Sequence, residues 1–400
     1  MTEQPKRKLR ILWQSNHPDA SSGYSNQTKD IIRMFLKSGW DGSNFGLINM
    51  FGQVGYINND ANGLRNYPLM DHSAGSDAML HHSRHFNADI VIALQDIWIL
   101  NPYDLQQVKG FVPWIPVDYD PIPKALLQNC RFANRIIAMS KFGQKQLADN
   151  GFASTYIPHH VDTSIFYPMD KKKRKMDVKI DPNNFIFGMV SANKDILPRK
   201  SFGHVLEAFK RFHDNHPNSL LYIHTDPNQM GGYPLQSHVQ YLGLEQCVGF
   251  PMSQPPFPPT YKWKLDTPKS EMNLIMNTFD MLLAPSSTEG FMIPGIEAQA
   301  CGVVPIVNRY TSMPELVIED KTGFITEVSK DCKHFMPVGG YMKFPNIDSL
   351  YNKMEQGFRS NLQQMGYAAR KWVVDNYDLE KVWSTKWIPF LDKLEKELYH

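Results

Sequence analysis

Short apolar runs alternate with amphipathic stretches along most of this chain. The apolar runs have the length and composition of buried strands and lie at residues 9–13, 88–94, 111–117, 185–190, 220–225, 248–251 and 280–284. A helix is predicted from about Asn26 to Lys37, because Ile31 and Phe35 share one apolar face and Gly39 can end it. Helices are also predicted at residues 205–209, 367–377 and 379–394. Strands that alternate with helices are typical of parallel sheets, so the pattern predicts an α/β fold.

One stretch in the second half combines a strand, a tight loop and a helix. The strand at residues 280–284 is followed by Gly290 and Pro294, which mark a loop. Residues 296–300 are compatible with a helical turn that Gly302 can end. Free backbone N–H groups in such a loop and at a helix start can hold the oxygens of an anion or a sugar.

Two carboxylates, Glu289 and Glu297, flank that loop. Glu289 precedes the predicted helix and Glu297 lies about one turn inside it, so both can face a ligand over the helix start. An ionised carboxylate accepts hydrogen bonds, which suits the paired hydroxyls of a ribose or hexose. The alternative interpretation is one surface glutamate and one helix-capping glutamate.

The run from Glu289 to Ala298, with Cys301 to Pro305 after it, resembles the E-x7-E signature of retaining glycosyltransferase family 4. Further matches to that family span nearly the whole chain, at residues 135–143, 156–162, 166–168, 312–317 and 321–324. The resemblance implies the GT-B fold, in which two Rossmann-like domains face each other across a cleft and use a nucleotide-sugar donor.

The resemblance also predicts the domain organisation. Residues 1–175 form an N-terminal Rossmann-like domain on the acceptor side with its linker, residues 176–375 form the C-terminal nucleotide-sugar-binding domain, and residues 376–400 form a terminal helix that returns to the first domain. The basic run Lys171–Lys175 is interpreted as a solvated linker, with a nucleic-acid contact or localisation signal as the alternative.

The resemblance implies a set of donor-binding residues. They are Gly23, Lys194, Arg199, Lys200, Glu289, Gly290, Phe291, Met292, Ile293 and Glu297. Lys200 matches the lysine that clamps the donor diphosphate, and either Lys194 or Arg199 takes the place of the family's arginine. Cations there stabilise the bound donor and the charge that grows on the leaving nucleotide. The alternatives are ordinary surface residues and, for Gly23, a turn glycine.

The implied roles of the other residues follow from the same resemblance. Glu297 holds the ribose, whereas Glu289 and the amides of residues 291–293 hold the donor sugar. Glu289, Asp118 and Lys200 are the candidate catalytic residues.

The sequence departs from the family near Asp118, where many members carry a histidine that touches the donor sugar. Asp118 or Asp120 can replace it, because a carboxylate can orient a sugar hydroxyl or accept the proton of the acceptor. For Asp120 the alternative is an Asp-Pro turn.

Composition adds few constraints. The apolar content of 42% and charged content of 20% are those of a soluble globular protein, and the net charge of +2 creates no global attraction to nucleic acid or anionic membranes. No apolar run approaches the roughly 18 residues of a membrane-spanning helix, and the start of the chain lacks a signal-type core, which favours a cytoplasmic location. His81 and His85 would share a helical face, but no acidic or cysteine partner is nearby in the sequence, and no metal site is predicted.

The sequence therefore predicts a retaining glycosyltransferase that needs no cofactor and takes a nucleotide sugar, such as a UDP- or GDP-sugar, as substrate. The acceptor hydroxyl belongs to a glycan or a hydroxymethylated DNA base, because the segment Trp13–Tyr24 resembles glycosyltransferases of viral and microbial genomes. The alternatives are a non-catalytic nucleotide-sugar binder, disabled by Asp118 in place of the histidine, and a GT-B epimerase or phosphorylase. Oligomeric state is not predicted.

Overall fold

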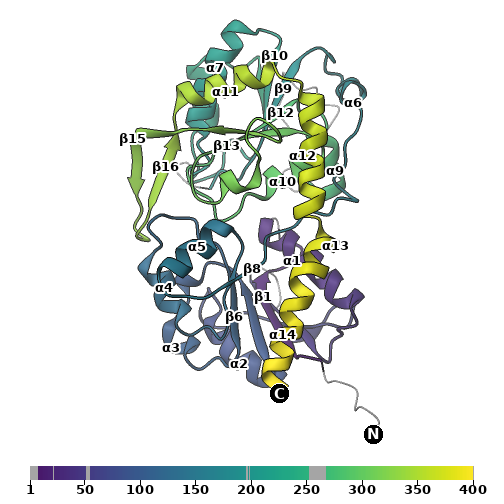
Figure 1. Cartoon of the computed structure of the whole chain (residues 1–400), viewed down its shortest axis with the longest axis vertical. Coiled ribbons are helices and arrows are strands. Elements are labelled where there is room, and N and C mark those ends of the chain that lie inside the picture. Colours follow the sequence, from purple (N-terminus) through teal and green to yellow (C-terminus); the bar gives the residue numbers. More distant parts are fainter. Residues whose placement is uncertain are drawn as a thin grey trace. The chain divides into compact units, whose positions relative to one another are not determined.

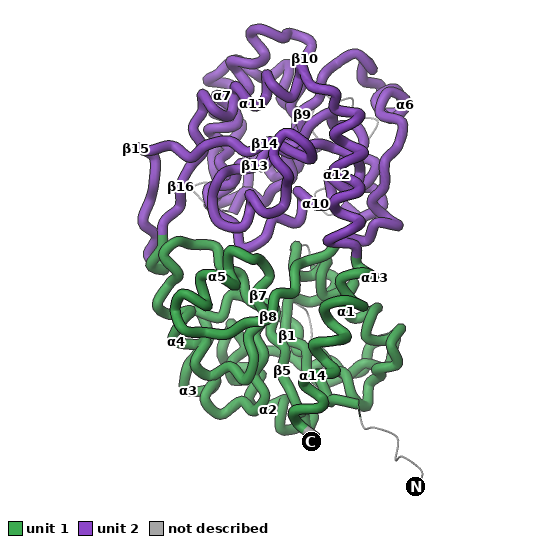
Figure 2. The backbone as a smooth tube through the Cα atoms, in the orientation of Figure 1, with its two compact units in different colours: residues 1–160, 338–340, 379–400 green, residues 161–337, 341–378 purple. Residues whose placement is uncertain are grey.

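The computed structural model describes residues 8–20, 22–50, 55–194, 197, 199–251 and 267–399. The chain divides into two compact units (Figure 2). Unit 1 contains residues 1–160, 338–340 and 379–400, and unit 2 contains residues 161–337 and 341–378. The sequence placed the linker at residues 171–175, whereas these residues group with unit 2.

Unit 1 is built on an eight-stranded sheet with the order β3-β4-β2-β1-β5-β6-β7-β8. Three of its strands, β1, β6 and β8, are labelled in Figure 1. All neighbouring strands are parallel except β3 and β4, which are antiparallel. The strands are β1 (Ile11–Asn16), β2 (Phe45–Met50), β3 (Asn58–Asn59), β4 (Arg65–Tyr67), β5 (Ile90–Leu94), β6 (Phe111–Ile115), β7 (Ile137–Ala138) and β8 (Thr155–Tyr156).

Helices connect and cover the strands of unit 1. They are α1 (Gly23–Lys37), α2 (Ser76–Phe86), η1 (Ile97–Ile99), α3 (Pro102–Leu105), α4 (Lys124–Cys130), α5 (Lys141–Asp149), α13 (Leu379–Val382), η3 (Trp383–Trp387) and α14 (Ile388–Tyr399). Ser140 caps α5 by accepting a hydrogen bond from the Gly143 N–H.

The C-terminal helices of unit 1 belong to its core. Trp387 of η3 is fully buried and lies 5.9 Å from Trp13 of β1 and 5.1 Å from Trp114 of β6, measured between ring centroids. Such aromatic pairs bury a large apolar area. The last helices of the chain are therefore an integral part of the unit that contains its first strand.

Unit 2 contains a six-stranded parallel sheet with the order β11-β10-β9-β12-β13-β14 and a separate antiparallel pair, β15-β16. The strands are β9 (Phe185–Val190), β10 (Ser219–His224), β11 (Val248–Gly249), β12 (Met281–Ala284), β13 (Val304–Asn308), β14 (Phe324–Thr326), β15 (Val328–Phe335) and β16 (Tyr341–Pro345). The helices are α6 (Lys171–Asp177), α7 (Phe202–Asn215), α8 (Leu235–Tyr241), α9 (Lys269–Met276), α10 (Ile293–Ala300), η2 (Met313–Leu316), α11 (Ile347–Phe358) and α12 (Leu362–Asn376).

Each predicted strand has a counterpart in the structure, and the two parallel sheets confirm the α/β class. The helix expected from about Asn26 begins three residues earlier, at Gly23, because the Ser22 hydroxyl accepts a hydrogen bond from the Ser25 N–H and caps it there. Gly302 follows α10 with a φ of +71°, as a helix-ending glycine should.

The solvated-linker interpretation of residues 171–175 is wrong. Asp170 caps a helix that begins at Lys171, and Lys175 on that helix is buried. The Lys175 ammonium lies 2.6 Å from a carboxylate oxygen of Asp280 and 2.8 Å from the carbonyl oxygen of Asn184. A buried charge is stable only with such partners, so this part of the basic run has a structural role.

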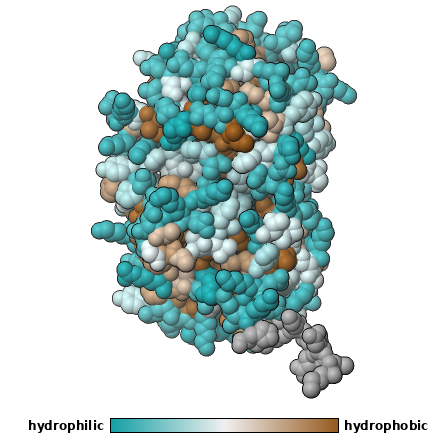
Figure 3. Space-filling model, viewed as in Figure 1, coloured by the Kyte–Doolittle hydropathy of each residue, from teal (hydrophilic) through white to brown (hydrophobic). Residues whose placement is uncertain are grey.

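The surface is ordinary for a protein of this composition. The face in Figure 3 is largely hydrophilic, and hydrophobic residues appear on it in small separate groups. Within the described residues, no helix combines the length and apolar character that crossing a bilayer requires.

Candidate active site

Three loops of unit 2 leave the sheet at the carboxyl ends of neighbouring parallel strands. They follow β9, β12 and β13, and open parallel sheets bind ligands at this edge. The loop after β9 carries Arg199 and Lys200, the loop after β12 carries Glu289, and the loop after β13 carries Thr311 and Ser312. Candidate residues that are far apart in the sequence are thus brought together within one unit.

The carboxylate of Glu289 lies at the centre of this group, with only 6% of its side chain exposed. One of its oxygens accepts a hydrogen bond from the Arg199 guanidinium at 2.8 Å, and the other forms an ion pair with the Lys200 ammonium. Arg199 also donates to the Thr288 carbonyl oxygen at 3.0 Å. One buried carboxylate therefore holds two cations in place.

These charges control the protonation of Glu289. Burial alone raises the pKa of the carboxyl, but the positive charges of Arg199 and Lys200 and the hydrogen bonds from Lys200 and Ser286 outweigh it and lower the pKa to about 2. Glu289 is therefore ionised at neutral pH and acts as a hydrogen-bond acceptor.

This lowered pKa predicts acid destabilisation of unit 2. The folded pKa of about 2 lies below the unfolded value, so Glu289 stabilises the fold above pH 4.5 and loses that contribution as the pH falls towards 2. The loss amounts to roughly 3 kcal/mol. We expect the difference in unfolding free energy between the native chain and Glu289→Gln to shrink by about this amount over that range, as measured by urea denaturation. Parallel stability curves for the two proteins would contradict it.

Hydrogen bonds fix the three loops to each other. The N–H and hydroxyl of Ser287 donate to the Arg199 carbonyl oxygen at 2.7 Å and 3.0 Å. The hydroxyls of Thr311 and Ser312 donate to the Glu289 carbonyl oxygen at 2.9 Å and 2.8 Å. The sequence alone did not predict a role for the hydroxyls of Thr311 and Ser312. Two adjacent hydroxyl residues at a strand's carboxyl end were the available signal.

Helix α10 begins directly after this network. Its N-cap is Met292 and its first residues are Ile293 and Pro294, so the N–H groups of the first turn lie next to the loop that carries Glu289. Glu297 lies on the second turn of α10 and is largely buried. Gly290 and Phe291 are buried in the connecting loop.

The structure separates the two candidates for the second cation. Arg199 pairs with Glu289, whereas Lys194 is exposed and makes no ion pair within the described residues. The neighbouring Asn193 is buried and is hydrogen-bonded to the backbone of Tyr233 through both its oxygen, at 2.7 Å, and its nitrogen, at 2.9 Å. Arg199, rather than Lys194, therefore joins Lys200 at the carboxylate.

The remaining candidates lie in unit 1. Gly23 is exposed at the first position of α1, directly after the loop that follows β1. Asp118 is half-buried three residues after the end of β6. Asp120 precedes a cis peptide bond to Pro121, as an Asp-Pro turn would. Both Gly23 and Asp118 thus occupy segments at the carboxyl ends of parallel strands.

Two of the three histidines on α2 have structural partners, and the third, His81, is exposed. His82 is buried with its Nε2 atom 3.0 Å from the Pro68 carbonyl oxygen, and the Nδ1 atom of His85 lies 3.0 Å from the Tyr67 hydroxyl. Among the described residues there is no group of three or more histidine, cysteine or acidic side chains arranged to bind a metal ion.

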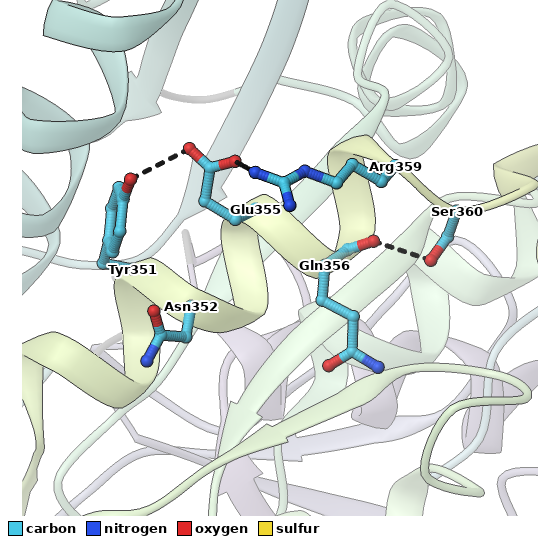
Figure 4. Close-up of a pocket in the computed structure, with 6 residues that line it drawn as sticks. All are labelled: Tyr351, Asn352, Glu355, Gln356, Arg359 and Ser360. Atoms are coloured by element: carbon cyan, nitrogen blue, oxygen red, sulfur yellow. Dashed lines mark hydrogen bonds and ion pairs between the residues drawn. The ribbon is translucent and has the colours of Figure 1, made fainter.

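A separate surface depression lies at the end of α11 (Figure 4) and has a volume of about 630 Å³. It is lined by Tyr351, Asn352, Glu355, Gln356, Arg359 and Ser360. Glu355 accepts hydrogen bonds from Tyr351 at 3.1 Å and from Arg359 at 2.8 Å. None of the lining residues belongs to the three loops around Glu289, so the depression is not part of the candidate site.

Comparisons with known proteins find similarity to glycosyltransferases. Residues 170–335, which include β9, β12, α10 and the Glu289 network, match the family described as Glycosyl transferases group 1. The D-inositol 3-phosphate glycosyltransferase of Segniliparus rotundus is 23% identical over 173 residues, which are 43% of this chain and 35% of that protein. The chain thus spans about a third of the length of this curated relative.

Two solved structures are similar over almost the entire chain. Sucrose-phosphate synthase from Thermosynechococcus elongatus has a TM-score of 0.75 at 14% identity and covers 98% of this chain and 99% of its own. Anabaena HepE, solved with UDP and glucose, has a TM-score of 0.68 at 15% identity and covers 96% of this chain and 100% of its own. At this identity the likeness shows the fold, which is GT-B as expected.

Proposed function

We propose that this chain, which has a glycosyltransferase group 1 domain at residues 170–335 and a GT-B fold, is a retaining glycosyltransferase of the E-x7-E type. It moves a sugar from a nucleotide-sugar donor to an acceptor hydroxyl. The observation that carries the proposal is the pair of cations, Arg199 and Lys200, held on Glu289 at the ligand-binding edge of the sheet. A non-catalytic nucleotide-sugar binder of the same fold is the alternative.

The charges of this group suit the donor. Arg199 and Lys200 outnumber Glu289, which leaves one positive charge for a diphosphate that is itself anionic. Charge-assisted hydrogen bonds from these side chains would hold the diphosphate and stabilise the charge that develops on it as the sugar departs. Anabaena HepE, which was solved with UDP and glucose, supports the donor class but does not select the base or the sugar for this chain.

The remaining donor contacts follow from the E-x7-E arrangement. Glu297 on α10 would accept hydrogen bonds from the ribose hydroxyls, whereas Glu289 and the N–H groups of residues 291–293 would bind the donor sugar. Gly23, at the start of α1, would lie beside the donor phosphates.

In the proposed reaction, the bond between the anomeric carbon and the diphosphate oxygen breaks through an oxocarbenium-like state. The acceptor oxygen forms its bond on the same face of the sugar, and its proton passes to the departing diphosphate or, where Asp118 acts as the base, to the Asp118 carboxylate. Arg199 and Lys200 carry the leaving-group charge, so we propose that transfer needs no metal ion. Transfer should then continue in the presence of EDTA.

The test incubates the protein with a panel of nucleotide sugars and two acceptor pools, hydroxymethylated DNA and glycan or glycolipid. Nucleotide release and the mass of the acceptor are measured. Gain of one sugar mass on an acceptor, lost in Glu289→Ala, would support the proposal and identify the acceptor class. Donor binding without transfer or donor hydrolysis would favour the non-catalytic binder. A free altered sugar nucleotide or a sugar phosphate would instead indicate an epimerase or phosphorylase.

Asp118 is proposed to orient a hydroxyl of the sugar or to accept the acceptor's proton. We expect Asp118→Asn to lower the transfer rate by roughly 10²-fold, the contribution typical of acid–base groups, with little change in donor affinity. Steady-state kinetics with calorimetric donor titration will separate the two effects. Asp120→Asn is the matched control, and equal losses in both variants would argue for a structural role of the turn.

A further inference from the structure

The antiparallel pair β15-β16 differs from the rest of unit 2 in its composition and its surface. Figure 1 shows it extending from the edge of unit 2 as a hairpin. Residues 328–345 contain three lysines and one aspartate, a net charge of +2 that equals the formal net charge of the whole chain. This short element therefore carries a local excess of positive charge.

The register of the pair sorts its side chains onto two faces. Lys333 pairs with Lys343 and Phe335 pairs with Tyr341, whereas His334 pairs with Met342 between them. Successive side chains of a strand point to opposite faces. Met342 and Phe344 are buried, so Lys333, Phe335, Tyr341 and Lys343 share the outward face.

The two lysines on the outward face lie directly opposite each other. Like charges at such cross-strand positions are destabilising, and neither Lys333 nor Lys343 forms an ion pair within the part of the chain that the structure describes. Each ammonium lies over an aromatic ring instead, Lys333 5.3 Å from the centroid of Tyr341 and Lys343 4.8 Å from that of Tyr310. The rings offset part of the repulsion, but no carboxylate among the described residues neutralises either ammonium. A pair of like charges that keeps no carboxylate partner is typical of a binding site.

Aromatic rings complete this face. The ring of Phe335 packs edge-on against Tyr341 with centroids 5.0 Å apart, and Phe335 remains 55% exposed. An exposed ring beside two cations provides a stacking surface and a site for anions on the same strand pair.

The hairpin is attached to the loop that carries Glu289. The N–H of Lys343 donates to the Ser287 carbonyl oxygen at 3.1 Å. The Asn308 amide bridges the two segments, because it donates to the carbonyl oxygens of Ser286 at 3.0 Å and Lys343 at 2.9 Å. The hydroxyl of Tyr310, whose ring lies beneath Lys343, donates to the Tyr341 carbonyl oxygen at 2.8 Å. A ligand on the hairpin would thus be placed next to the proposed donor site.

We propose that the outward face of β15-β16 binds a single-stranded segment of nucleic acid, with phosphates on Lys333 and Lys343 and bases stacked on Phe335 and Tyr341. If this nucleic acid is the acceptor of the sugar, that role rests on the proposed glycosyltransferase function. Binding of nucleic acid to the hairpin does not depend on that function. Paired lysines beside exposed rings are the combination that single-strand binders use. A neutral glycan would not require two unneutralised cations, and the face lacks the aliphatic side chains with which an amphipathic surface enters a membrane.

The test measures fluorescence anisotropy of labelled single-stranded DNA with the full chain at several salt concentrations. For the variant with Lys333→Ser and Lys343→Ser, we expect the salt dependence of log K to weaken by about 1.4, since each phosphate contact contributes roughly 0.7. Phe335→Ala should lower the affinity about tenfold through lost stacking. Alginate and vesicles of phosphatidylcholine with phosphatidylserine serve as the competing polyanion and the membrane.

The matched control removes two exposed lysines elsewhere in unit 2, Lys172→Ser and Lys321→Ser, and should retain the native salt dependence. Equal effects of both double variants, or binding of alginate or vesicles as tight as that of DNA, would overturn the inference. Thermal denaturation of each variant verifies folding. Binding of the nucleotide-sugar donor to the native chain is titrated separately. If the donor does not bind, the proposed function is wrong, but the DNA-binding measurement still tests the hairpin.

Discussion

Replacement of Lys200 by alanine is expected to lower the rate of sugar transfer by roughly 10²- to 10³-fold, the cost of losing one charge-stabilising group in an active site. The Lys200 ammonium is paired with Glu289 at the carboxyl end of the sheet. Without it, a buried carboxylate retains only Arg199, and the leaving diphosphate loses a cation that the proposed mechanism requires. Nucleotide release under saturating donor and acceptor measures the effect.

Two further variants make this prediction specific. Lys200→Arg keeps the charge and should recover part of the rate, although a guanidinium and an ammonium differ in geometry. Lys172→Ala removes an exposed lysine of the same unit and should leave the rate within about twofold of the native value. If Lys200→Ala also remains within twofold, Lys200 has no role in the leaving-group chemistry.

The same assay decides whether Arg199 or Lys194 is the cation that joins Lys200 at the donor diphosphate. The structure pairs Arg199 with Glu289, and Lys194 is exposed without an ion pair among the described residues. We therefore expect Arg199→Ala to lower the rate far more than Lys194→Ala. A larger loss in Lys194→Ala would mean that the loop rearranges when the donor binds.

The sequence predicted the sheet strands well because they are buried on both faces and appear as continuous apolar runs. Phe185–Val190 and Phe111–Ile115 are examples, with boundaries within two residues of the prediction. The start of α1 was less accurate, because it depends on a hydrogen bond from the Ser25 N–H to the Ser22 hydroxyl, whose effect periodicity does not reveal.

The candidate site was predictable in residue type but not in pairing. Glu289, Arg199 and Lys200 were identified through the family resemblance, yet ninety residues separate the carboxylate from its cations, and only the strand order β9-β12-β13 brings them together. The loop hydroxyls of Thr311 and Ser312 were missed because they act through the backbone of Glu289, a contact that no spacing rule predicts.

The basic run at residues 171–175 illustrates a different limit. Charge runs usually form solvated surfaces, and nothing in the local sequence distinguishes Lys175 from its neighbours. Its partner Asp280 is 105 residues away, next to β12, and also accepts a hydrogen bond from the Ile186 N–H at 2.7 Å. Lys175 therefore connects α6 to β9 and β12 through Asp280.

From this arrangement we expect Lys175→Met to reduce the unfolding free energy of unit 2 by roughly 3–5 kcal/mol, the cost of breaking a buried pair from one side. Only 4% of the Lys175 side chain is exposed, so the variant would leave the Asp280 carboxylate without its partner and with little water to replace the ammonium. Urea denaturation measures the change.

The exposed Lys172, on the same helix, provides the matched control, and Lys172→Met should change the free energy by no more than about 0.5 kcal/mol. The double variant Lys175→Met with Asp280→Asn no longer contains the unpaired Asp280 carboxylate. It should therefore be more stable than the sum of the two single effects predicts, and the difference is the coupling free energy. If the two single lysine variants are equally stable, then Lys175 is hydrated in solution and the basic run is a solvated surface after all.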